Sequence, residues 1–111
     1  MTPEEINRRI ATWLGLKCTC KGAYWGACEM HSNGGVATDY YRTNAAMDLL
    51  VVLVERGYTY TLQDNIHGAG HGLFIWRRDD TLNELADSSY QPTIPAAICT
   101  AILELIEREG R

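Results

Sequence analysis

The sequence has no apolar run approaching the roughly 18 to 20 residues that a membrane span needs. Its charged beginning, MTPEEINRR, is not followed by the apolar core of a signal peptide. The 10 basic residues are outnumbered by 14 acidic ones, which gives a net charge of −4, and they are scattered apart from the pair Arg77 and Arg78. We therefore expect a cytoplasmic protein whose partner is neither a membrane nor a nucleic acid.

Motifs of catalytic sites are scarce as well. Ser32, Ser88 and Ser89 lack the surroundings of an activated nucleophile, and the acidic pair Asp79 and Asp80 is typical of a turn. The chain has 111 residues, of which 46% are hydrophobic, so it is long enough for one domain with a small core. We predict a single domain over residues 1–111 that is not an enzyme.

Two helices are predicted in the first half of the chain. The first, over 3–14, has Thr2 as its N-cap and apolar residues on one face. The second, over 40–56, can be capped by Asp39 or Thr43. It is apolar on nearly every side, so we expect it to be largely buried.

The second half predicts an antiparallel sheet followed by a helix. Period-two alternation over 58–64 and the apolar run over 72–78 indicate a hairpin, and 81–89 is expected to add a third strand. The helix over 94–109 follows Thr93 as N-cap and carries a continuous apolar stripe. Because one small sheet cannot bury its own faces, helices must cover it, which predicts an α+β fold.

Three stretches resemble a known family: MTPEEINRRIATWLG, TDYYRTNAAMDLLVVLVERG and PAAICTAILELI. With the short hairpin between them, they resemble the phage ABA sandwich domain family of small bacteriophage and prophage proteins. The resemblance implies an α-β-α sandwich and a protein that works in the cytoplasm of a bacterial host. It brings no catalytic residues.

The stretch KCTCKGAYWGACEMH concentrates metal ligands in a loop over 17–35. Four side chains with the spacing C-x-C-x7-C-x2-H can surround a tetrahedral zinc ion: Cys18, Cys20, Cys28 and His31. With all four ligands from the protein, such a zinc is structural. Unliganded thiols and redox-active thiols remain alternative interpretations, whereas Cys99, on the last apolar stripe, is expected in the core.

A second glycine-rich stretch, NIHGAGHGLFIW, has two interpretations. Its backbone N–H groups, histidines and a nearby arginine can bind an anion, or its glycines can supply the positive φ angles of an ordinary hairpin connection. Aromatic and basic residues at the start of the second helix can likewise form a nucleotide pocket or seal the core. The candidate ligand contacts are Tyr40, Arg42, His67, His71, Trp76 and Arg77.

These observations lead to two functional hypotheses. The first is a phage accessory protein that counters host defence by sequestering a nucleotide-type immune signal. Sequestration requires nearly complete burial of the ligand, so this hypothesis also predicts a homo-oligomer. The second is a zinc-stabilised interaction module that blocks or regulates a host or phage protein, for instance a host defence protein.

Overall fold

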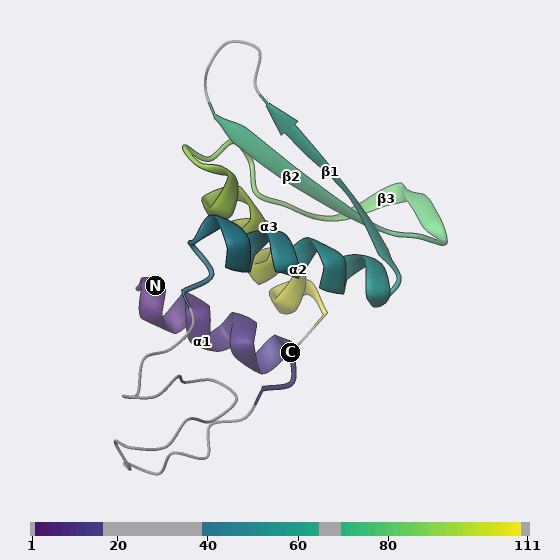
Figure 1. Ribbon diagram of the computed structural model, residues 1–111. Coiled ribbons are helices and arrows are strands. Elements are labelled where there is room, and N and C mark those ends of the chain that lie inside the picture. The colour runs from purple at the N-terminus through teal and green to yellow at the C-terminus, as the bar shows by residue number, and fades with distance from the viewer. Residues whose placement is uncertain (1, 17–38, 65–69, 110–111) are drawn as a thin grey trace. The chain divides into compact units, whose positions relative to one another are not determined.

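The computed structural model describes residues 2–16, 39–64 and 70–109 (Figure 1). The chain has two compact units, Met1–Tyr40 and Tyr41–Arg111. The helices and strands of the described residues are α1 (Pro3–Trp13), α2 (Thr43–Glu55), β1 (Tyr58–Asp64), β2 (His71–Arg77), β3 (Asp80–Asp87) and α3 (Ile94–Arg108). The predicted α+β class is confirmed, and none of these helices has the length and hydropathy to cross a membrane.

The first unit contains α1 and the residues that lead towards α2. As predicted, Thr2 is the N-cap of α1, and its hydroxyl accepts a hydrogen bond from the backbone N–H of Glu5 at 3.2 Å. The buried side chain of Asn7 connects this helix to the end of the unit. Its Oδ1 accepts from the backbone N–H of Tyr40 at 3.0 Å, and its Nδ2 donates to Oδ1 of Asp39 at 3.4 Å.

Helix α2 begins at Thr43, later than the sequence predicted, and neither expected cap is used. The carboxylate of Asp39 is engaged by Asn7, and Thr43 is already the first helical residue. Arg42 is the N-cap instead, with extended backbone angles (φ −82°, ψ 141°) and no capping hydrogen bond from its side chain. The helix ends as expected, because Gly57 takes a positive φ of 88°.

The second unit is built on a three-stranded antiparallel sheet in the order β1-β2-β3, which confirms the hairpin and the third strand. In the hairpin, Tyr58 is opposite Arg77 and Asp64 is opposite His71. The pairing of β2 with β3 is irregular after Ile75. Two of the predicted ligand contacts, His71 and Arg77, therefore lie at opposite ends of the hairpin.

Helices α2 and α3 cover one face of this sheet (Figure 1). Helix α3 contacts β2 and β3, whereas α2 contacts β1 and α3, so the two helices lie side by side. The core between them and the sheet includes completely buried side chains of α2, β2 and α3, among them Leu53, Leu73, Ile75, Ile98, Ile102 and Leu105. Within Tyr41–Arg111 the described elements thus form two layers, one of strands and one of helices.

Candidate functional site

The residues predicted to bind zinc, Cys18, Cys20, Cys28 and His31, lie outside the described part of the chain. His67 of the predicted anion loop lies outside it as well. Among residues 2–16, 39–64 and 70–109, no three or more His, Cys, Asp or Glu side chains are placed to hold a metal ion. The zinc site therefore stays a prediction, whereas Cys99 is completely buried in α3, as expected.

His71 lies at one end of the β1–β2 hairpin, where its ring is paired with a carboxylate. Its Nδ1 is 2.5 Å from Oδ1 of Asp64, and the two side chains are 30% and 76% exposed. The backbone of His71 pairs with Gln91, and Gly70, just before it, has a φ of 114°. A Cβ at position 70 would lie 2.1 Å from the carbonyl oxygen of Gln91, so only glycine fits there.

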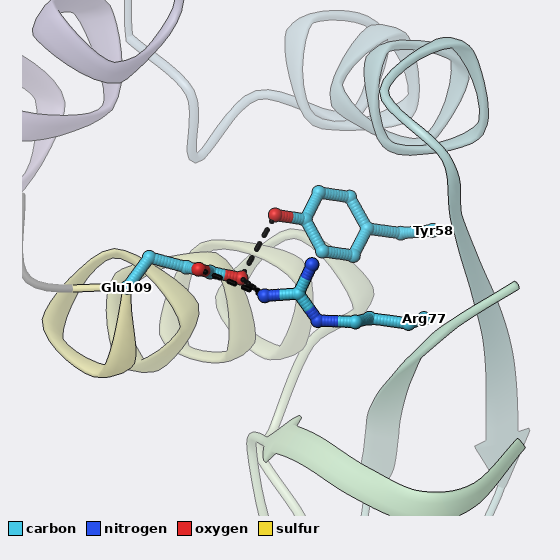
Figure 2. Close-up of polar contacts among 3 residues, drawn as sticks. All are labelled: Tyr58, Arg77 and Glu109. Atoms are coloured by element: carbon cyan, nitrogen blue, oxygen red, sulfur yellow. Dashed lines mark hydrogen bonds and ion pairs between the residues drawn. The ribbon is translucent and has the colours of Figure 1, made fainter. Parts of the chain in front are cut away.

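Arg77 lies at the opposite end of the hairpin and is already engaged (Figure 2). Its Nη2 donates to both carboxylate oxygens of Glu109, at 3.0 and 3.1 Å. The hydroxyl of Tyr58 donates to the same carboxylate at 3.0 Å. Burial, and then this hydrogen bond, raise the pKa of Tyr58 above its ordinary value. Through these hydrogen bonds Glu109, the residue after α3, is connected to Tyr58 of β1 and Arg77 of β2.

The predicted ligand contacts on β2 do not converge on one site. His71 and Arg77 are six residues apart on one strand, a separation of about 20 Å. Trp76 lies on the face of the sheet opposite the buried side chains of Leu73 and Ile75, because successive strand residues alternate. A single small phosphate cannot contact all three of these side chains.

The other two predicted contacts lie in different units. Tyr40, the last residue of the first unit, is only 5% exposed, so its ring offers little surface for stacking. Arg42 precedes α2 in the second unit and is exposed. Tyr40 therefore fits the alternative interpretation, an aromatic residue that seals a small core.

Three aromatic rings gather on the sheet face that α2 and α3 do not cover. The rings of Phe74 and Trp76 are 6.5 Å apart, and Tyr90 meets Phe74 edge to face at 6.4 Å. Gly72 makes this possible, because a Cβ there would lie 3.3 Å from atoms of both Phe74 and Tyr90. We call Phe74, Trp76 and Tyr90 the aromatic surface. Phe74 and Trp76 are two positions apart on a predicted strand, so the sequence indicates that they share a face. Tyr90 lies outside that strand, and the sequence analysis missed it.

Helix α2 carries an exposed apolar stripe, which corrects the expectation that it is largely buried. Met47, Val51 and Val54 are 44%, 57% and 45% exposed. They border a hollow of about 460 Å³ between the helix and Tyr60 of β1, which is also lined by Asp48, Leu50 and Glu55. Within the second unit, α2 contacts α3 and β1 through its other faces. We call this region the α2–β1 groove.

No family model, no curated protein and no solved structure matches the chain.

Proposed function

We propose that this protein is a non-enzymatic binding protein that engages a protein partner through the α2–β1 groove. The observation that supports this proposal is the stripe of Met47, Val51 and Val54, which is about half exposed beside an edge strand. Contiguous apolar surface of this kind marks protein-binding sites in soluble proteins. Completing the burial of each of these side chains contributes about 1 kcal/mol to binding before the costs of association.

The biological setting of the proposal comes from the sequence. Its resemblance to the phage ABA sandwich domain family suggests a bacteriophage accessory protein that acts in the host cytoplasm. In that setting the partner is a host defence protein, and binding it stoichiometrically blocks its action. The proposal includes a structural zinc in the 17–35 loop, which would order a segment with few apolar side chains of its own, and the second helical layer of an α-β-α sandwich.

Affinity capture with three forms of the chain tests this function. The wild type, Val51→Lys and Leu82→Lys are each used to capture proteins from a bacterial lysate, and the captured protein is identified and purified for direct binding measurements. Leu82 is the matched control because it is 93% exposed and lies in β3, away from the groove. We expect the purified partner to bind the wild type and Leu82→Lys equally. Equal binding to Val51→Lys would contradict the proposal.

Sequestration of a nucleotide-type signal is a second candidate, favoured by the aromatic surface. Tyr90 is 41% exposed and Phe74 and Trp76 are partly exposed, and aromatic rings on a sheet can stack nucleobases, each stacked base contributing about 1 to 3 kcal/mol. This candidate is an alternative to the α-β-α sandwich, whose second helical layer would cover these rings. Calorimetry against cyclic and ADP-ribose-type nucleotides tests it with Trp76→Ala, using Val51→Lys as control. Loss of binding in Trp76→Ala alone, with a native mass above that of one chain, would support this candidate. No binding to the wild type across the panel would rule it out.

A further inference from the structure

The outer edge of β1 is open among the described residues, because β1 is the first strand in the order β1-β2-β3. Its sequence, YTYTLQD, is rich in residues that favour strands. It lacks the lysines and prolines by which edge strands normally resist pairing, and its one charge, Asp64, is at its end. The strand is thus suited to accept a further strand.

The hydrogen bonds of β2 show which β1 residues face that edge. Leu73 turns its backbone towards the β3 side: its N–H donates to Oγ of Ser88 at 2.8 Å, and its carbonyl accepts from the N–H of Ser88 at 3.0 Å. Its partner on β1 is Leu62. In antiparallel sheets, such a non-hydrogen-bonded pair directs the backbone groups of both residues away from each other. Leu62, and by alternation Tyr60, therefore present N–H and C=O to the outer edge.

Helix α2 packs against β1, the edge strand, and against α3. Packed helices are about 8 to 10 Å apart, whereas neighbouring strands are about 4.8 Å apart. Because α3 contacts both β2 and β3, these ideal spacings give an axis of α2 about 1 to 3 Å outside β1. A second copy that paired antiparallel through its own β1 would place its α2 within about 3 Å of this one. A helix pair cannot approach so closely, so the edge excludes a second copy and admits a single extended segment.

Charge restricts the sequence of that segment. The groove is bordered by Asp48 and Glu55, which are seven residues apart on α2, or about 10 Å. Val51 lies between them. Residues i and i+4 of a strand are about 13 Å apart, and both lie on the same face as residue i+2. A segment with basic residues at i and i+4 and an apolar residue at i+2 therefore matches the groove, because long basic side chains can also cover Met47 and Val54 with their methylenes.

We propose that the α2–β1 groove binds an extended basic and apolar segment of the partner protein as a fourth strand of the sheet. The proposal rests on the function proposed above and specifies its mode of recognition. Main-chain hydrogen bonds to β1 hold the segment, and its helix-facing side chains contact α2. Antiparallel addition directs the N–H groups of the helix-facing residues towards Tyr60 and Leu62.

The experiment uses a synthetic peptide, Thr-Lys-Thr-Val-Thr-Lys-Thr, with a fluorescent label. We expect saturable binding to the wild-type chain that weakens at least tenfold in Val51→Lys and is unchanged in Leu82→Lys. A peptide with Glu in place of both Lys is expected to bind at least tenfold more weakly. Circular dichroism verifies that both variants are folded, which we expect because both side chains are exposed.

Methylated backbone amides test the strand addition itself. Methylation at the Lys and Val positions removes the N–H groups that face β1 and is expected to abolish binding, whereas methylation of the inner Thr amides is not. Equal effects of both sets would overturn strand addition. If Val51→Lys still weakened binding in that case, the protein-binding surface would stand. Absence of binding up to millimolar peptide would overturn the proposed segment, while capture of a partner that depends on Val51 would still support the function.

Discussion

Replacing Ser88 with alanine tests one of the two hydrogen bonds that join Leu73 of β2 to Ser88. Ser88 is 3% exposed, accepts from the N–H of Leu73 at 2.8 Å and donates to the carbonyl of Ser89 at 2.6 Å. Alanine fits the same space but leaves the N–H of the completely buried Leu73 without this acceptor. An unsatisfied buried donor costs about 1 to 3 kcal/mol. We therefore expect Ser88→Ala to lower the free energy of unfolding by that amount.

Urea denaturation followed by circular dichroism measures the loss. The midpoint is expected to fall while the slope with denaturant concentration stays unchanged, because the surface exposed on unfolding is the same. Thr81→Ala, at an exposed position of β3, is the control and is expected to stay within about 0.5 kcal/mol of the wild type. A loss below about 0.5 kcal/mol in Ser88→Ala would refute the assignment of this bond.

Three further predictions concern charge and metal. Glu109→Ala removes the acceptor of Tyr58 and Arg77 and should destabilise the chain by about 1 to 2 kcal/mol. Because the pKa of Tyr58 is higher in the folded than in the unfolded state, the stability that the protonated Tyr58 hydroxyl contributes should be lost as the pH rises above about 10. A series of wild-type denaturation curves at increasing pH that showed no such loss would contradict this. Partial burial and the nearby carboxylates of Asp87 and Glu104 raise the pKa of Glu84, so its charged form is disfavoured in the folded state. Glu84→Gln should therefore stabilise the chain by less than about 0.5 kcal/mol at neutral pH. At about pH 3, where Glu84 is protonated in the wild type, the substitution should have no stabilising effect. Cys28→Ser should release one zinc per chain, and elemental analysis of wild-type protein purified without chelator that finds well under one zinc would count against the metal site.

The elements of the fold follow from local sequence signals. Thr2 and Thr93 cap their helices as predicted, because a hydroxyl before an apolar-periodic run satisfies an early N–H group wherever the helix packs. The start of α2 could not be placed in this way. Asn7, more than thirty positions away, donates to the carboxylate of Asp39 and accepts from the backbone N–H of Tyr40, so the expected cap is engaged elsewhere. A window of neighbouring residues contains no information about such a contact.

The candidate site was less predictable, for a similar reason. Met47, Val51 and Val54 are indistinguishable by type from the buried residues of the same helix, and only the packing of α2 against α3 and β1 determines which of its apolar side chains are buried. Arg77 is a reasonable phosphate contact by type, but Glu109, 32 positions away, occupies it. Residue type indicates what a side chain can bind, whereas its availability is determined by tertiary packing.

Amide hydrogen exchange, resolved by residue, tests the central claim most directly. In the free chain, Tyr60 and Leu62 should exchange faster than Thr59 and Thr61, whose N–H groups face β2. Addition of the partner, or of the Thr-Lys-Thr-Val-Thr-Lys-Thr peptide, should slow exchange at Tyr60 and Leu62 and leave the aromatic surface unchanged. Exchange that is unaltered at Tyr60 and Leu62 in the bound state would contradict binding at the β1 edge.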